Sequence, residues 1–444
     1  MTWLETFLTL DLPALAAGAL SAAACGVIGC FLVLRRMSLM GDAIGHAVLP
    51  GLVGAFLLAG SANAGAMFVG AVVVGVLTTG MTEAVHRFGK VEQGASMGVV
   101  FTVLFALGVL MLERLAGSNV HIDADCVLYG QMEGVVWLDA PARLAGLFEA
   151  ESWAHFPRQV TTLGAVCVLT FGFVALLYKE LKITTFDPAL ATTMGIHAGV
   201  LRYVLMTVVA VVAVASFEAV GSILVVATLV IPGMIAHLLT DRLWVMLMLA
   251  GVIGFVSACG GYVAGAFGPG WLGLGGSVSA AGMTGVVLGV MLVGTAVLAP
   301  GRGGLSVWLR RRSLRARIEM EDVLGAAYRA FEGGARVVSA GALRGTVGSA
   351  GRAARAAEIG VRRGLLRREG EGWSLTEEGR MEAARLVRAH RMWETYLVRE
   401  GGTEASAVHD SAERLEHVTG GAIERELGRK VGGERTDPHG RPIP

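Results

Sequence analysis

Two patterns of acidic and histidine residues identify candidate metal ligands in this sequence. The first is Asp42 with His46 in the segment SLMGDAIGHAVLPG, where the four-residue spacing places both side chains on one face of a helix. A carboxylate and an imidazole together suit a first-row divalent cation. The alternative is a hydrogen bond between the two side chains that orients a helix near the lipid headgroups. Since ionisable groups inside a membrane are costly, they are expected to line a cavity or to pair with each other.

The second pattern lies near the C-terminus, where the last 55 residues hold four of the ten histidines. Two sets of residues recur at helical spacing and so share helix faces: His390 with Glu394, and His409 with Glu413, Glu416 and His417. Imidazoles and carboxylates that converge from two helices form a suitable cage for a divalent ion. The alternative is a solvated charged helix face, on which histidine, glutamate and arginine are common.

Helices in a membrane must position the first pattern, because the composition excludes a wholly soluble chain. Apolar residues make up 54% of the sequence and charged residues 16%, with a mean hydropathy of +0.62. A soluble domain carries about 25% charged residues. The charges are also unevenly divided: residues 1–300 hold 11 Lys and Arg against 16 Asp and Glu, and residues 301–444 hold 26 against 20. The sequence therefore predicts an apolar membrane part followed by a basic, soluble part.

Nine segments are apolar and long enough to predict membrane spans. They are 13–34, 39–60, 65–85, 95–112, 160–178, 203–217, 219–239, 243–267 and 279–299. The segment 119–138 is too polar for a free span, although it could re-enter the membrane. With nine spans the basic loops fall on one side, which is then cytoplasmic, so the soluble part lies inside the cell and the N-terminus outside. An even number of spans would put the N-terminus inside.

Two further features of the membrane part have a functional and an ordinary interpretation. Glu218 lies in the apolar stretch SFEAVGSILVVATLVIP and either lines the same path as Asp42 and His46 or occupies an exposed outer turn between two spans. The segment 178–199 is polar and amphipathic, and it lies between strong spans on the basic side. It is either a short cytoplasmic helix that docks into a partner or an ordinary loop.

Three motifs of the membrane part resemble one transporter family, the permease subunits of zinc, manganese and iron ABC importers. They are RRMSLMGDAIGHAVLPG (35–51), YKELKITTFDPALATTMGI (178–196) and VGSILVVATLVIPGMIAHLL (220–239), in the family's order. The resemblance covers about residues 10–300. It implies an all-α polytopic protein of about eight or nine spans, like a type II ABC importer, in the inner (plasma) membrane. It places the family's Asp–His pair on Asp42 and His46, and the family's ATPase contact on Phe186, Asp187, Pro188 and Gly195.

The same resemblance implies partners. It implies a homodimer or a heterodimer with a sister permease, an extracytoplasmic protein that delivers the metal, and an ABC ATPase subunit on the inside. The sequence contains no G-x-x-x-x-G-K-[ST] motif, the loop that cradles nucleotide phosphates. ATP hydrolysis is therefore expected on a separate chain, and this chain is expected to be a transport subunit without an ATP site or a catalytic residue.

The soluble part divides into a basic juxtamembrane linker at 301–317, a degenerate winged helix at 318–380 and a helical metal-binding and dimerisation domain at 381–444. Within the winged helix, residues 364–379 predict two short strands around a glycine turn. AHRMWETYL (389–397), VHDSAERLEHV (408–418) and DPHGRPIP (437–444) resemble the metal-binding and dimerisation half of the iron- and manganese-dependent repressors of the DtxR/MntR family, and GWSLTEEGR (372–380) resembles the end of their wing.

This second resemblance implies a divalent-metal site, for Mn²⁺ or Fe²⁺ or, less well matched, Zn²⁺. The implied ligands are His390, Glu394, His409, Glu413, Glu416, His417 and Asp322. We expect His390, Glu413, Glu416 and His417 to form one site, with Glu394 and His409 in a neighbouring one. Gly325 replaces a further acidic ligand that the family's manganese members carry, and Glu413 replaces a softer ligand of the iron members, which favours Mn²⁺ or Fe²⁺.

The DNA-reading region departs most from the repressors. Residues 338–366 can be aligned with a helix-turn-helix, but Gly341 and Gly345 fall where apolar core residues are expected, and Arg352 and Arg355 replace other family residues. We therefore expect a loosely folded helix and no sequence-specific DNA partner. The sequence favours an ABC permease with a cytoplasmic metal-sensing tail. The alternatives are a membrane-anchored, metal-responsive transcription regulator and a stand-alone secondary carrier.

Overall fold

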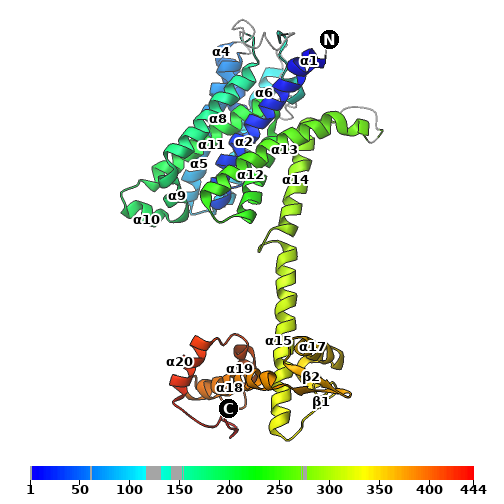
Figure 1. The fold of residues 1–444 in the computed structure, drawn as a ribbon. Coiled ribbons are helices and arrows are strands. Elements are labelled where there is room, and N and C mark those ends of the chain that lie inside the picture. Colours follow the sequence, from blue (N-terminus) through cyan, green and yellow to red (C-terminus); the bar gives the residue numbers. More distant parts are fainter. Residues whose placement is uncertain are drawn as a thin grey trace. The chain divides into compact units, whose positions relative to one another are not determined.

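The computed structural model describes residues 3–60, 63–116, 132–141, 153, 155–271, 273 and 278–444. The first part of the predicted re-entrant segment, residues 119–131, lies outside the described residues. The chain forms two compact units, Met1–Ser306 and Val307–Pro444, and each is considered by itself. Figure 1 shows that both units are built mainly of helices. The predicted all-α polytopic fold with a winged-helix and helical C-terminal region is confirmed.

Within its described residues, the first unit contains eight helices long and apolar enough to cross a membrane. They are Trp3–Leu34, Met40–Ala59, Gly65–Gly89, Gln93–Arg114, Arg158–Leu176, Ala198–Val220, Leu243–Gly270 and Ala280–Leu298. A shorter apolar helix covers Leu224–Leu239. Together these nine helices occupy the nine predicted ranges, because long runs of apolar residues leave the backbone no partner in lipid except itself.

The central helix of this unit is α2 (Leu12–Leu34), whose glycines and most of whose alanines are buried. Helices α12 (Ser222–Leu239) and α13 (Leu243–Trp271) pack directly against it. A Cβ atom on Gly29 would lie 1.8 Å from the carbonyl oxygen of Leu229, and one on Gly254 would lie 2.3 Å from that of Ala22. Small residues therefore allow the backbones to approach closely, which is how helices associate in a membrane.

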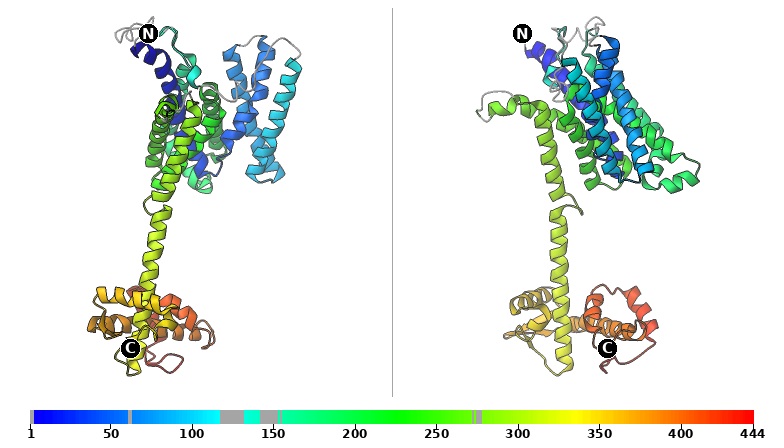
Figure 2. Two further views of the ribbon diagram at one scale, coloured as in Figure 1. Left: turned by 90° about the vertical axis from the view of Figure 1, so that its right-hand side faces the viewer. Right: turned by 180° about the vertical axis from the view of Figure 1, so that it is seen from behind.

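A second group of neighbouring helices consists of α4 (Leu49–Ala59), α5 (Ala64–Gly89) and α6 (Gln93–Ala116), and it is visible in both views of Figure 2. Helix α3 (Met40–Ala47) packs against α5, α6 and α11 (Ala198–Val220). The second predicted span is thus two helices, α3 and α4, that meet at Val48. Pro50 in the first turn of α4 fits this break, because proline has no backbone N–H to continue the preceding helix.

The remaining helices of the unit are α1 (Trp3–Thr6), α8 (Arg158–Leu176), α9 (Tyr178–Phe186), α10 (Pro188–Thr193) and α14 (Ala280–Leu298). Two short elements, η1 (Phe7–Asp11) and η2 (Met132–Gly134), complete the description. Helices α9 and α10 cover the segment that the sequence predicts either as a docking helix or as a loop. The residues there are helical.

The second unit begins inside α15 (Gly304–Glu332), so the basic segment predicted as a linker is helical from Gly304 onward. After it come β1 (Val338–Ser339), α16 (Arg344–Val347), α17 (Ala350–Arg362), β2 (Leu366–Glu369) and β3 (Gly372–Leu375). The strands form an antiparallel sheet in the order β1-β3-β2, with Leu366 opposite Leu375 and Glu369 opposite Gly372. This arrangement is a winged helix whose wing is the β2–β3 hairpin.

Helix α17 corrects the expectation of a loose helix. Ser349 caps its start by accepting a hydrogen bond from the Arg352 N–H, and its buried side consists of Ala353, Ala356, Ala357 and Gly360. The two glycines expected at core positions are exposed instead, and Leu343 and Val347 fill the core beside them. The core positions expected for the two glycines are thus held by side chains two residues further along. Small side chains suffice here because α17 packs closely on its neighbours.

Helix α18 (Glu377–Arg399) follows the wing, and α19 (His409–Glu416) and α20 (Gly421–Val431) complete the unit. Thr376 caps α18 by accepting from the Gly379 N–H at 3.0 Å, and two glutamates occupy the first turn, where they favour the positive end of the helix dipole. Helices α19 and α20 both pack on α18. This packing brings the histidine-bearing faces of α18 and α19 together.

Candidate metal sites

The membrane pair lies on α3, where Asp42 Oδ1 is 3.4 Å from His46 Nε2. Both side chains are partly exposed, at 43% for Asp42 and 37% for His46. The rings of Phe101 and Phe105 on α6 flank the imidazole, with centroids 6.1 and 5.8 Å away. The pair is thus held by a helix and two aromatic rings but is not sealed into the core, so a cation has access to both groups.

Glu218 lies in the last turn of α11 and is exposed. Among the described residues, no hydrogen bond or ion pair joins it to Asp42 or His46. Gly221 ends this helix with a φ of +83°, a conformation that favours glycine. The geometry agrees with a position at a turn between two helices, one of the two interpretations that the sequence allows.

The residues expected to contact an ATPase lie at the junction of α9 and α10. Asp187 caps α10 by accepting from the Leu190 N–H at 2.9 Å, and Pro188 is its first residue. Gly195, at a φ of +82°, ends it. Three large apolar side chains are exposed at this junction: Phe186, Leu190 and Met194. An exposed apolar cluster of this kind suits a protein partner.

Arg35, directly after α2, connects this junction to the central helix. Its guanidinium donates to the hydroxyl of Thr184 at 3.1 Å and to that of Thr185 at 3.1 and 3.2 Å. Both threonines belong to α9. A displacement of α9 is therefore opposed by hydrogen bonds to the helix around which the unit is packed.

In the soluble unit, the first candidate metal site is formed by His390 and Glu394 on α18 with His409 on α19. His390 Nε2 lies 3.1 Å from Glu394 Oε1 and 3.1 Å from His409 Nδ1, and His409 Nδ1 lies 3.0 Å from Glu394 Oε1. The His390 and Glu394 side chains are buried, whereas His409 is exposed. His439 Nε2 is 4.0 Å from Glu394 Oε1 at the edge of this group.

The second candidate site combines Asp322 on α15 with Glu416 and His417 at the end of α19. His417 Nε2 lies 3.0 Å from Asp322 Oδ1 and 3.8 Å from Glu416 Oε1. The other oxygen of Glu416 accepts from His390 Nδ1 at 2.6 Å. Glu416 therefore connects the two sites, with one oxygen toward each histidine.

The structure groups the implied ligands differently from the sequence expectation. His390 lies with Glu394 and His409, and Asp322 lies with Glu416 and His417. Glu413 is half-buried and belongs to neither group. One contributing residue, Glu321, was not predicted: it is buried, and its Oε2 accepts from His417 Nδ1 at 2.8 Å. Its position beside Asp322 on a predicted helix was the available signal.

The carboxylates around His390 and His417 raise the pKa of both histidines. Burial lowers the pKa of His417, but hydrogen bonds to Asp322 and Glu321 outweigh it and raise the pKa to about 10. In the same way, burial lowers the pKa of His390, and Glu394 and Glu416 raise it to about 9. For Glu394, burial raises the pKa, but hydrogen bonds from His390 and His409 bring it down to about 2. Without metal, His390 and His417 are therefore protonated and pair with the carboxylates around them.

This donor set fits a divalent metal. It contains only carboxylate oxygens and imidazole nitrogens, the ligands that Mn²⁺, Fe²⁺ and Zn²⁺ accept. Three of the six members, His390, Glu394 and Glu416, are buried, and the six come from three packed helices, α15, α18 and α19. Metal binding displaces the protons of the imidazolium groups, so that the neutral imidazoles and the carboxylates can then bind the cation together.

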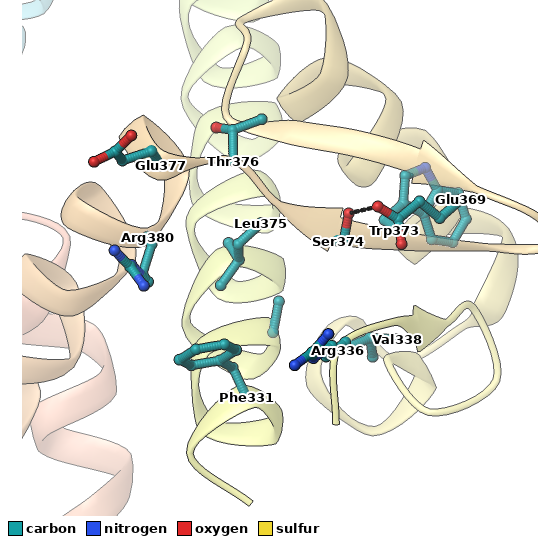
Figure 3. Close-up of a pocket in the computed structure, with 11 residues that line it drawn as sticks. Phe331, Arg336, Val338, Glu369, Trp373, Ser374, Leu375, Thr376, Glu377 and Arg380 are labelled. Atoms are coloured by element: carbon teal, nitrogen blue, oxygen red, sulfur yellow. Dashed lines mark hydrogen bonds between the residues drawn. The ribbon is translucent and has the colours of Figure 1, made fainter. Parts of the chain in front are cut away.

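A separate pocket of about 610 Å³ lies at the base of the wing, between α15, β1, β3 and the start of α18 (Figure 3). Phe331 and Leu375 give it an apolar side, and Arg336 and Arg380 lie across from each other at its rim. Ser374 donates to Glu369 Oε1 at 2.8 Å within it. Among the described residues that line it, none belongs to the two metal groups, and no pattern in the sequence predicts this pocket.

Comparisons with known proteins agree with both parts. A model of the ABC 3 transport family matches residues 8–140 and 156–270, and a model of the iron dependent repressor, metal binding and dimerisation domain matches residues 376–444. The chain is 40% identical over 301 residues to the manganese transport system membrane protein MntD of Bacillus subtilis, covering 68% of this chain and 96% of that protein. It is 33% identical over 359 residues to the zinc transport system membrane protein TroD of Treponema pallidum, covering 80% of this chain and 93% of that protein.

Among solved structures, PsaBC from Streptococcus pneumoniae in complex with Fab is similar, with a TM-score of 0.54 and 24% identity. The match covers 68% of this chain and 98% of that chain. At this identity the likeness concerns the fold of the membrane unit alone. Both resemblances noted in the sequence, to metal permeases and to metal-dependent repressors, are confirmed.

Proposed function

Since the chain belongs to the ABC 3 transport family, we propose that it is the permease subunit of an ATP-driven importer for a divalent transition metal, with manganese as the first candidate cargo and iron or zinc next. One observation supports this most directly: Asp42 and His46 lie side by side on α3, accessible and flanked by two aromatic rings. Relatives named for manganese and for zinc transport support the class of cargo.

The proposed transport unit needs three partners. The ATPase docks on the α9–α10 junction through Phe186, Leu190 and Met194, and Asp187, Pro188 and Gly195 shape that junction. A metal-binding protein delivers the ion on the opposite side. A second permease subunit, either a copy or a sister chain, completes the path. The basic loops favour an orientation in the plasma membrane with α9, α10 and the C-terminal unit in the cytoplasm.

The C-terminal unit is proposed to sense cytoplasmic metal through its two linked sites. The ligands are His390, Glu394, His409, Asp322, Glu416 and His417, and Glu413, which the resemblance implies as a ligand, joins them when the ion binds. Bound metal would replace the protons of His390 and His417 and tie α15, α18 and α19 together. We further propose that this ordering holds the transporter in a state that resists the ATPase cycle, so that import falls when cytoplasmic metal is plentiful.

The winged helix gives limited support to DNA binding. Arg352, at the start of α17, is engaged within the unit by the Val347 carbonyl and by Glu319, 3.5 Å away. Arg355 and Arg362 remain exposed and suit contacts to phosphates, which carry no sequence information. We therefore propose regulation of transport and not of transcription. Sequence-specific retardation of DNA by the full chain would overturn this choice.

The proposed function is tested by metal uptake into proteoliposomes that contain the chain, its ATPase and its metal-binding protein. Mn²⁺, Fe²⁺ and Zn²⁺ are supplied separately and in competition, with and without ATP inside. ATP-dependent accumulation of at least one of these ions is expected, with Mn²⁺ preferred. Accumulation driven by an ion gradient in the absence of ATP would point to a secondary carrier instead.

A further inference from the structure

The two ring nitrogens of His417 face different kinds of partner. Nε2 points to the candidate metal site, toward Asp322 Oδ1 and Glu416 Oε1. Nδ1 donates to Glu321 Oε2 at 2.8 Å, on the other edge of the ring. Both the imidazole and the Glu321 carboxylate are buried, at 7% and 5% exposure, so solvent does not compete for this bond.

We propose that Glu321 is a positioning residue that fixes the orientation and tautomer of His417, keeping the proton on Nδ1 so that Nε2 is free to bind the metal. This inference rests on the proposed metal site and adds a residue to it. A neutral imidazole has one N–H and one lone pair, and the hydrogen bond at one nitrogen decides which nitrogen can ligate. Metal-binding histidines commonly donate their second N–H to a carboxylate for this reason.

The contacts of Glu321 indicate that it is not itself a ligand. Its second oxygen, Oε1, accepts from Arg317 Nε at 2.6 Å, one helical turn earlier on α15. Both carboxylate oxygens are therefore occupied on the side of the ring away from Asp322. The guanidinium also fixes the carboxylate plane, so Arg317 supports the orientation of His417 through Glu321.

The first site uses a similar arrangement with one difference. His390 donates from Nδ1 to Glu416 while Nε2 faces Glu394 and His409. Glu416, however, also directs its other oxygen at the second site, so its replacement removes a ligand together with the support. Among the described residues, the side chain of Glu321 forms hydrogen bonds with His417 and Arg317, and it belongs to neither group of proposed ligands. It therefore allows the orienting effect to be tested while every proposed ligand is kept.

The test measures Mn²⁺ affinity of the full chain in detergent by electron paramagnetic resonance of the free ion. Asp42→Ala and His46→Ala are present throughout, so that the membrane pair does not contribute. Glu321→Ala is expected to weaken binding by about 10- to 100-fold, the range for loss of such outer partners. Glu321→Gln should lose less, because its amide oxygen still accepts from Nδ1–H but carries no charge. Glu319→Gln, on the same helix and paired with Arg352, is the matched control and should bind normally.

Two further measurements distinguish a loss of metal affinity from a loss of folded structure in the Glu321 variants. The melting temperature of each metal-free variant shows whether the unit is intact, and the absorption bands of bound Co²⁺ report the ligand set directly. Wild-type affinity and Co²⁺ bands in both Glu321 variants would overturn the positioning role while leaving the metal site standing. Equal losses in Glu321→Gln and Glu319→Gln would also overturn it. If the full chain with its C-terminal unit unsubstituted binds neither Mn²⁺ nor Co²⁺, the proposed metal site is wrong and the positioning role is wrong with it.

Discussion

The membrane pair and the C-terminal sites use the same two side-chain types in opposite settings. Asp42 and His46 are two groups on one helix, each more than a third exposed. The C-terminal sites gather six carboxylates and imidazoles from three helices, half of them buried, and link them through Glu416. A transport site must release its ion, so few ligands and ready access suit it. A sensing site must hold its ion long enough to change the fold, which needs more ligands at fixed positions.

The largest expected effect separates the two regions by function. Asp42→Ala or His46→Ala should reduce ATP-dependent Mn²⁺ uptake to background, because each variant leaves a single ligand on α3. The metal-induced rise in melting temperature of the C-terminal unit should persist in both. Uptake by proteoliposomes and thermal melting of the same preparations check the two statements. Near-normal uptake in both variants would remove the pair from the path and break the contrast.

Substitution of ligands in the C-terminal unit should leave transport itself intact and remove the response of that unit to metal. Saturation at a hundredfold excess of metal over Kd stabilises a folded form by about 2.7 kcal/mol, which raises the melting temperature of a unit this size by several degrees. Glu416→Ala/His417→Ala should remove most of that rise, because it removes two ligands of one site and the link to the other, and leaves only the group of His390, Glu394 and His409. Uptake should continue but should no longer fall when metal is placed on the cytoplasmic side. Retained feedback in this double variant would leave a metal site without a regulatory role.

Metal binding by the C-terminal unit should depend on pH, because protons and the metal compete for the ring nitrogens of its histidines. The pKa of His417 is raised from an unfolded value near 6.5 to about 10. The stabilisation of the metal-free unit by this group is therefore complete below pH 6.5 and is lost as the pH rises toward 10. Metal affinity should change in the opposite direction, by up to about tenfold per pH unit for each proton displaced. The metal-induced melting shift, measured from pH 6.5 to 8.5, should grow; a shift that shrinks over this range would contradict the assigned ligands.

The two regions also differ in how much of them the sequence predicts. The nine apolar ranges and the pair on α3 follow from local hydropathy and helical spacing, so each is found where it was expected. The grouping of the C-terminal ligands in the metal-free structure differs from the expected one, because it depends on how α15 lies against α19, two helices that are far apart in the chain. The same reason explains why Glu321 was missed. The break between α3 and α4 and the burial of Leu343 and Val347 in the winged helix depend on packing between helices. Local sequence patterns do not predict such packing.

The smallest expected effect concerns Glu413, where resemblance and geometry disagree. The resemblance implies a ligand, whereas the structure leaves this side chain outside both groups. If Glu413 joins only when metal binds, it must first reorient, and part of its interaction energy is spent on ordering the side chain. Glu413→Ala should therefore weaken Mn²⁺ binding less than Glu416→Ala, which removes a carboxylate already placed between two histidines. Affinities of the two variants, with Glu424→Ala on α20 as a control outside both groups, measure the difference. An equal or greater loss in Glu413→Ala would show that the metal-bound site is arranged as the resemblance implies and not as the metal-free geometry suggests.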